Sequence, residues 1–238
     1  MSAGAAFFDV DETLITVKSM FAFLRHWLAE HGDDGSEYTR VTDEIKERAD
    51  AGTPREEINR HYYRLFRGVA YTALAESGQR WFDAYAAAGG AFYLDTLEAL
   101  RAHRESGVRT VLVSGSFAPA IAPVAAAVGA DHLIATEPVL DERGALTGEV
   151  LRPMIGEAKG EAVVAFLREH GISTDDTWGY GDHGTDLPFL WIVAHPFRRG
   201  DDPHLLAAAT AAWGSLGDRV GDVDGTALSD DRKVVSAW

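Results

Sequence analysis

Short apolar runs that end in polar residues alternate along this chain with segments of helical periodicity. Apolar runs of four to eight residues bounded by turn residues are typical of buried strands. The pattern predicts strands at 5–8, 108–113, 132–136, 177–181 and 192–194. It also predicts a β-hairpin at 139–148, with its turn near Gly144, because Gly and Asp separate two short apolar stretches.

Apolar residues spaced three and four apart predict helices at 18–30, 37–51, 74–88, 92–105, 118–128, 157–169, 187–191 and 203–213. A further helix begins near Thr53-Pro54, a typical helix start, and we expect Ile58, Tyr62, Leu65 and Phe66 on its apolar side. Residues 214–238 are rich in Gly and Asp and show little periodicity, so we expect them to be irregular.

Strands that alternate with helices predict an α/β fold with a Rossmann-like parallel sheet. The stretch from Ile15 to Gly90 shows no convincing strand, so we expect a small all-helical module inserted after the first strand. The expected domains are an α/β core made of 1–16 and 91–238 and a helical insert at 17–90.

Composition narrows the possible partners. The 238 residues suffice for one large domain or for a core with a smaller module. A net charge of −15 argues against sequence-independent binding of nucleic acid and against an anionic membrane. The chain has no Cys, and it shows neither a signal peptide nor an apolar run of membrane-spanning length. We therefore expect a soluble cytoplasmic protein; nothing in the pattern indicates an oligomeric state.

Polar clusters close three of the predicted strands, and a lysine stands near a helix start: Asp9, Asp11 and Thr13; Ser114 and Gly115; Asp182 and Asp186; and Lys159. The carboxyl ends of parallel strands share one edge of a sheet, so these groups are expected to meet in one cleft. Their chemistry suits phosphoryl transfer. A carboxylate can attack phosphorus, Mg²⁺ prefers carboxylate oxygens, and a hydroxyl, an N–H and a lysine can hold the transferred group. A second carboxylic acid can protonate the leaving oxygen.

These residues carry a family resemblance. Asp9-Val10-Asp11-Glu12-Thr13, Ser114, Lys159 and Gly181-Asp182-His183-Gly184-Thr185-Asp186 resemble, in order, the four motifs of the haloacid dehalogenase (HAD) superfamily. The helical insert resembles the type-I cap of its phosphoserine-phosphatase-like branch, a lid whose joints would lie at 16–19 and 88–91. The resemblance covers roughly residues 5–213.

The resemblance implies a role for each motif residue. Asp9 is the expected nucleophile and a metal ligand, and Asp11 the general acid and base with its main-chain carbonyl on the metal. Asp182 is expected to bind Mg²⁺ directly, and Asp186 to support the metal waters or the lysine. The remaining residues have supporting roles: Ser114, the Gly115 N–H and Lys159 hold the phosphate, and Thr13 orders the loop.

Asp11 favours a phosphohydrolase, because dehalogenases of this superfamily lack that acid. We expect a Mg²⁺-dependent phosphomonoesterase that acts on a small phosphorylated metabolite. Phosphoserine phosphatases carry an acidic residue shortly after the first motif, where this chain has Lys18. This difference and the arginines of the third helix favour a sugar, cyclitol or polyol phosphate, or an ester with a second anionic group. A phosphoserine-type substrate stays an alternative. Lys18, Arg60 and His183 are candidate substrate contacts, although Arg60 and His183 also fit ordinary helix and loop positions.

Two non-enzymatic alternatives also remain at this point. A receiver domain places an Asp, a hydroxyl and a Lys together as a phosphoacceptor, although receivers are about half this length and lack a helical insert. A degenerate HAD protein could bind a phosphorylated molecule without turnover, although such proteins usually lose a motif residue.

Overall fold

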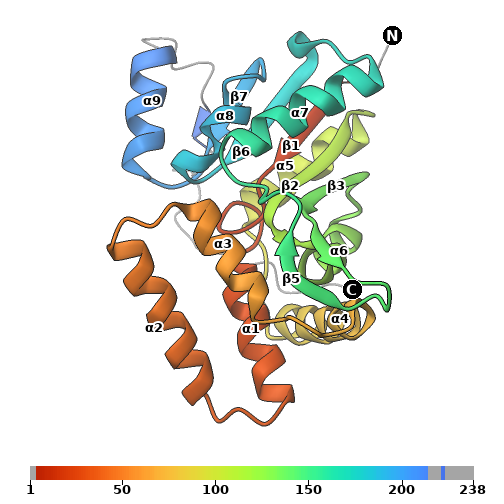
Figure 1. The fold of residues 1–238 in the computed structure, drawn as a ribbon. Coiled ribbons are helices and arrows are strands. Elements are labelled where there is room, and N and C mark those ends of the chain that lie inside the picture. Colours follow the sequence, from red (N-terminus) through yellow and green to blue (C-terminus); the bar gives the residue numbers. More distant parts are fainter. Residues whose placement is uncertain (1–3, 214–220, 223–238) are drawn as a thin grey trace.

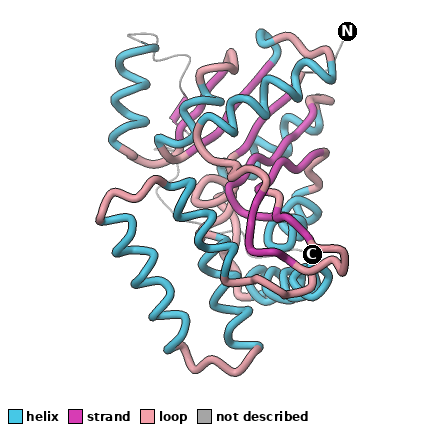
Figure 2. Tube along the Cα trace, viewed as in Figure 1, coloured by secondary structure: helices cyan, strands magenta, loops and turns pink. Residues whose placement is uncertain are grey.

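A six-stranded sheet runs through the centre of the protein (Figures 1 and 2). The computed structural model describes residues 4–213 and 221–222. The strands are all parallel, in the order β3-β2-β1-β6-β7-β8. Their bounds are β1 Ala5–Phe8, β2 Arg109–Phe117, β3 His132–Thr136, β6 Thr177–Gly181, β7 His195–Arg198 and β8 Gly221–Asp222. The predicted α/β class with a parallel sheet is confirmed.

Strand β1 is buried on both faces, which explains its uninterrupted apolar sequence. Phe7 packs edge-on against Phe166, with ring centroids 5.6 Å apart, on one face of the sheet. Phe8 points to the other face and stacks on Tyr180 at 4.4 Å. Successive side chains of a strand alternate between faces, so β1 joins two separate apolar clusters.

Helices cover both faces of the sheet (Figure 1). The Phe7 face packs against α7 (Glu157–His170) and α8 (Leu187–Leu190), and Leu205 of α9 (Pro203–Trp213) joins the same cluster. The Phe8 face packs against α5 (Leu94–Glu105) and α6 (Ala118–Val128). This is the three-layer arrangement expected of βαβ units.

The segment between β1 and α5 forms four helices, as predicted: α1 Ser19–Glu30, α2 Ser36–Asp50, α3 Arg55–Arg64 and α4 Tyr71–Ala87. Helices α1 to α3 lie beyond one end of the sheet (Figure 1). Phe23 of α1 packs against Phe117 of β2, with ring centroids 5.5 Å apart, so the insert shares an apolar cluster with the sheet. The division into a core (1–16 and 91–238) and a cap (17–90) stays a prediction.

Helix α4 lies directly against α6. A Cβ atom at Gly78 would stand 1.7 Å from the carbonyl oxygen of Pro119, so only glycine permits this approach. The fourth helix of the insert is therefore docked on the helical layer of the core.

The predicted hairpin is confirmed as the antiparallel pair β4 (Pro138–Leu140) and β5 (Leu146–Val150). It packs against the insert, beside α3 (Figure 2). The Gly68 N–H donates to the Leu146 carbonyl at 2.7 Å, and the Leu146 N–H donates to the Val69 carbonyl at 2.9 Å. A segment from the core part of the sequence thus pairs with the connection between α3 and α4.

The predicted strand at 192–194 is wrong, because these residues turn after α8 and the ladder forms with the next four residues. Val193 inserts its side chain toward Gly179, where a Cβ atom would meet it at 2.9 Å. Pro196 pairs opposite Gly179 in the observed register. Most of the irregular segment expected at 214–238 lies outside the described residues, but Gly221 and Asp222 form β8.

Candidate active site

The carboxyl ends of β1 and β6 are neighbours at the point where the strand order reverses, the usual position of a ligand site in such sheets. Asp9 follows β1, and its N–H donates to the carbonyl of Tyr180 at 2.9 Å. Asp182 follows β6. Two of the predicted acidic clusters therefore meet at one edge.

Lys159, at the start of α7, links the acidic residues. Its ammonium group donates to the carboxylate of Asp9 and to Asp186 Oδ1, the latter at 2.7 Å. Lys159, Asp9 and Asp186 are 4%, 6% and 1% exposed, so these contacts are almost completely removed from solvent. Asp9, Asp182 and Asp186 can each present one oxygen so that all three lie within 4.8 Å of one another.

Burial, together with the neighbouring charges, shifts the pKa values of these groups. Burial raises the pKa of Asp9 well above its ordinary value, and the charge of Lys159 opposes this. Burial and the charge of Asp186 raise the pKa of Asp182 to about 7. Burial alone would lower the pKa of Lys159, but the charges of Asp186 and Asp9 reverse this and raise it. Three carboxylates around one ammonium leave a local excess of negative charge that a bound cation would relieve.

The sequence after β6 folds so that Asp186 turns back toward the strand end. Its Oδ2 accepts hydrogen bonds from the N–H groups of Asp182 and His183, both at 3.2 Å. A Cβ atom at Gly181 would stand 2.8 Å from Asp186 Oδ2, so the glycine makes room for the carboxylate. Asp186 therefore orders this loop and contacts Lys159 at the same time.

The loop after β1 turns sharply, since Glu12 adopts a positive φ of 60°. Asp11 lies just before this turn, and its Oδ1 is buried with no hydrogen-bond partner among the described residues. Burial raises the pKa of Asp11 to about 6, although polar groups of Ser19 oppose the shift. Thr13 Oγ1 donates to Asp182 Oδ1 at 3.2 Å, which ties this loop to the end of β6.

Ser114 and Gly115 lie within β2 rather than after it, where the pairing with β3 shifts register. Phe8 pairs with Leu112, so Ser114 lies beside the residues that follow β1. Ser114 is 1% exposed, and its Oγ accepts a hydrogen bond from the N–H of Ser116 at 3.1 Å. The second motif thus lies at the same sheet edge as Asp9.

The three candidate substrate residues are each held by a neighbour. Lys18 Nζ lies 3.3 Å from a carboxylate oxygen of Glu12, and both side chains are about half exposed. Arg60 donates to the carbonyl oxygen of Val150 at 2.8 Å, which links α3 to the hairpin. The side chain of His183 caps the short helical turn that follows it. Their part in substrate binding stays a prediction.

Sequence reasoning missed a group of residues around the carbonyl oxygen of Gly115. This oxygen accepts hydrogen bonds from Asn59 Nδ2 at 2.9 Å, Tyr63 Oη at 3.3 Å and Thr136 Oγ1 at 2.8 Å. The predicted apolar side of α3 is confirmed for Tyr62 and Phe66, which are buried, and Ile58 and Leu65 are partly buried against the same cluster. The prediction omitted Asn59 and Tyr63, which are buried as well. Asn59 precedes Tyr62, Tyr63 and Phe66 by three, four and seven residues, and this helical spacing is the feature of the sequence that could have placed it on the buried side.

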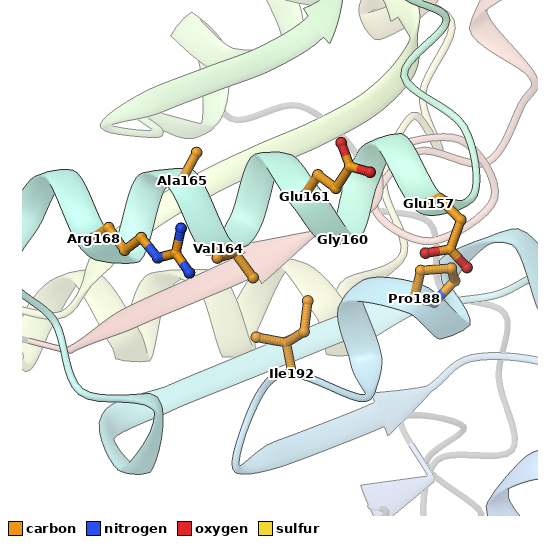
Figure 3. A pocket seen from close by; sticks show the side chains of 8 residues that line it. All are labelled: Glu157, Gly160, Glu161, Val164, Ala165, Arg168, Pro188 and Ile192. Atoms are coloured by element: carbon orange, nitrogen blue, oxygen red, sulfur yellow. The ribbon is translucent and has the colours of Figure 1, made fainter.

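A groove of about 430 Å³ lies on the outer side of α7, next to α8 (Figure 3). Its lining includes Glu157, Glu161, Arg168, Pro188 and Ile192. None of the motif residues lines it, so this groove is separate from the acidic cluster.

The family follows from comparison with known proteins. The model of the family described as haloacid dehalogenase-like hydrolase matches residues 6–190. The chain therefore belongs to this family, and the match includes all four motifs.

Two curated relatives are similar over part of their length. An "Inhibition of morphological differentiation protein" from Streptomyces azureus is 31% identical over 119 residues, which are 50% of this chain and 43% of the relative. A "Probable phosphatase" from Mycobacterium tuberculosis is 33% identical over 103 residues, which are 43% of this chain and 36% of the relative. The chain thus matches less than half the length of these relatives.

Solved structures share the whole fold. A protein of unknown function from Bordetella pertussis superposes with a TM-score of 0.79 and 26% identity, covering 94% of this chain and 100% of the other. A substrate-bound phosphoserine phosphatase superposes with a TM-score of 0.64 and 20% identity, covering 87% and 90% of the two chains. The expected HAD fold and its likeness to the phosphoserine-phosphatase-like branch are thereby confirmed.

Proposed function

We propose that the protein is a Mg²⁺-dependent phosphomonoesterase that hydrolyses a small phosphorylated metabolite through an aspartyl-phosphate intermediate. The observation that carries the proposal is the buried contact of Lys159 with Asp9, inside a cluster of three carboxylates. Membership of a family of hydrolases supports an enzyme over a receiver-type phosphoacceptor.

In the first half-reaction a carboxylate oxygen of Asp9 attacks phosphorus and the bond to the leaving oxygen breaks. Lys159, the Ser114 hydroxyl and the Gly115 N–H hold the phosphoryl oxygens as charge develops on them. Asp11 donates its proton to the leaving oxygen, a task that suits a carboxyl group whose pKa burial raises to about 6.

In the second half-reaction Asp11, now a carboxylate, accepts a proton from water. The resulting hydroxide attacks phosphorus, the bond to Asp9 breaks, and inorganic phosphate leaves. Asp9 is then a carboxylate again and Asp11 is protonated, so the cycle closes with one ester bond hydrolysed by one water.

The donor set fits Mg²⁺. Carboxylate oxygens of Asp9, Asp182 and Asp186 converge within 4.8 Å, and hard oxygen donors are what this ion prefers. Asp9, the main-chain carbonyl of Asp11 and Asp182 would hold the ion, with Asp186 in support. Bound there, the ion supplies positive charge that offsets the charge of the phosphate and of the carboxylates.

For the substrate we favour a sugar, cyclitol or polyol phosphate, with a phosphoserine-type ester as the alternative. The pairing of Lys18 with Glu12 moderates the positive charge that first suggested this preference.

No helix among the described residues is both long and apolar enough to cross a bilayer.

The test is phosphate release from p-nitrophenyl phosphate and from a panel of phosphorylated metabolites, with Mg²⁺ and with excess chelator. We expect turnover that needs Mg²⁺, no turnover in Asp9→Asn, and normal turnover in the exposed control Asp175→Asn. Turnover retained by Asp9→Asn would refute the mechanism. Binding of esters by the wild-type protein without any release would establish a binding protein instead.

A further inference from the structure

The side chain of Asn59 in α3 is buried, with only 3% exposed. Of its two polar atoms, only the nitrogen has a hydrogen-bond partner among the described residues. Its Nδ2 donates to the Gly115 carbonyl oxygen at 2.9 Å. A carbonyl oxygen can only accept, so this contact fixes which end of the amide is nitrogen. Asn59 Oδ1 therefore points away from Gly115, and it has no hydrogen-bond partner among the described residues.

The hydrogen bond to the Gly115 carbonyl does not by itself explain why a buried Asn with an unpartnered oxygen stands at this position. The Gly115 carbonyl oxygen has two lone pairs, and Tyr63 Oη and Thr136 Oγ1 already donate to it. A buried oxygen without a partner weakens the folded state, and such an atom in a native site requires an explanation. One explanation is that the oxygen accepts its hydrogen bond from a ligand and is therefore paired only in the complex.

The surroundings of Asn59 connect it to the neighbourhood of Asp11, the proposed acid. Asn59 Nδ2 also lies 3.7 Å from the sulfur of Met20, the residue after Ser19 at the start of α1. In the described part of the chain, Asp11 Oδ1 and Ser116 Oγ are likewise buried without a hydrogen-bond partner, and polar groups of Ser19 lie at the Asp11 carboxyl. Burial raises the pKa of Tyr63, and the charge of Asp11 contributes to this shift. Because the Tyr63 hydroxyl donates to the same Gly115 carbonyl oxygen as Asn59, Asn59 and Asp11 belong to the same part of the site.

We propose that Asn59 Oδ1 accepts a hydrogen bond from a hydroxyl group on the leaving group, so that Asn59 determines specificity for hydroxylated phosphomonoesters. An amide oxygen carries no charge and matches a neutral hydroxyl, whereas an ammonium group would favour a carboxylate. This inference rests on the proposed function, because it requires Asp11 to face the leaving oxygen.

The experiment compares glycerol 3-phosphate with propyl phosphate, which has the same carbon chain without hydroxyl groups. The quantity measured is the ratio of kcat/KM for the two esters in the wild type, in Asn59→Ala and in Tyr63→Phe. Tyr63→Phe is the matched control, since it removes a donor to the same Gly115 carbonyl but leaves Asn59 Oδ1 in place.

A site built to bind a substrate hydroxyl discriminates strongly against an analogue that lacks it, so we expect the wild type to prefer glycerol 3-phosphate at least about tenfold. Both variants lose some activity toward both esters. Asn59→Ala reduces the preference to about twofold or less, and Tyr63→Phe retains it. Asn59→Ser, which keeps a polar side chain, replaces the alanine variant if circular dichroism shows that the latter does not fold.

Equal losses toward both esters in Asn59→Ala, or a wild type without preference, would overturn the inference and leave the proposed function intact. A wild type that is inactive toward every ester of the panel would overturn both.

Discussion

The main-chain N–H of Thr16 donates a hydrogen bond to Tyr85 Oη at 3.0 Å, and the two hydroxyl oxygens lie 2.8 Å apart. Thr16 stands on the connection that leaves β1 for the insert, and Tyr85 lies in the last turn of α4, before the chain returns to the core. Thr16 Oγ1 also donates to the Gly90 carbonyl at 2.9 Å, and Tyr85 Oη donates to the Ala91 carbonyl at 2.7 Å. The two predicted joints of the insert are therefore cross-linked to each other, so any movement of the insert as a lid has to involve both connections together.

Tyr85→Phe tests this cross-link. The change leaves the ring in place but removes the hydroxyl from Thr16 and Ala91, so we expect the free energy of unfolding to fall by about 1–2 kcal/mol. Urea denaturation measures it. Tyr71→Phe is the control, because the Tyr71 hydroxyl has no hydrogen bond among the described residues, and we expect a change within about 0.5 kcal/mol. Equal effects of the two changes would show that the cross-link does not stabilise the joints.

Gly78→Ala tests the docking of α4 on α6. Alanine stabilises an isolated helix by about 1 kcal/mol relative to glycine, so helix propensity alone predicts that Gly78→Ala is stabilising. The added Cβ would lie 1.7 Å from the Pro119 carbonyl oxygen and would force the two helices apart. We expect a net loss of about 2 kcal/mol or more in the free energy of unfolding.

The exposed change Thr72→Ala, on the same helix, is expected to alter stability by no more than about 0.5 kcal/mol. A stabilised Gly78→Ala protein would contradict the close approach of the two helices.

The parts predicted well from the sequence depend on local patterns. The run before Asp9 and the run before Asp182 are apolar because β1 and β6 are buried, and parallel pairing alone brings these two residues together. Such patterns do not fix the bounds of strands. The apolar residues at 192–194 predict a strand, but apolar character does not distinguish a paired strand from a turn that buries one side chain.

Contacts between distant segments were not predictable from periodicity. Asn59 was missed because the apolar pattern favours Ile58 over its polar neighbour on the inner side of α3, whereas Ile58 is only partly buried and Asn59 is 3% exposed. Its bond to Gly115 joins residues 56 positions apart, and no repeat along the helix encodes that pairing. The pairing of Leu146 with Val69 is equally non-local, so the contact of the hairpin with the insert required the structure.

Glu30 of α1 gives a pH-dependent link between α1 and α4. Hydrogen bonding from Arg80 lowers the pKa of Glu30 from 4.5 to about 2, with burial opposing and Ser77 assisting. The unfolded chain therefore takes up this proton near pH 4.5, whereas the folded protein takes it up only near pH 2. The stabilisation is present above pH 4.5 and is lost as the pH falls from 4.5 to about 2.

The carboxylate is partly open to solvent, which screens the pair, so Glu30→Gln should cost about 1 kcal/mol at pH 7. Urea denaturation from pH 7 down to pH 2.5 should show the wild type and the variant converging in the acid range. The exposed change Glu105→Gln, on α5, should leave stability at pH 7 unchanged. A difference that stays constant over the pH range would show that the charge of Glu30 contributes nothing.

Asp11→Asn separates the roles of the two strand-end carboxylates. An alkoxide leaves poorly without a proton, whereas p-nitrophenolate leaves readily, so loss of the acid should slow turnover of an alkyl phosphate about 100-fold or more. With p-nitrophenyl phosphate the first half-reaction should survive, but the second should fail, because no base remains to activate water. Mixing should therefore give a burst of p-nitrophenol close to one equivalent of enzyme, followed by slow turnover. Asp9→Asn, which lacks the nucleophile, should give no burst. Equal slowing of both esters by Asp11→Asn, without a burst, would show that Asp11 does not transfer the proton.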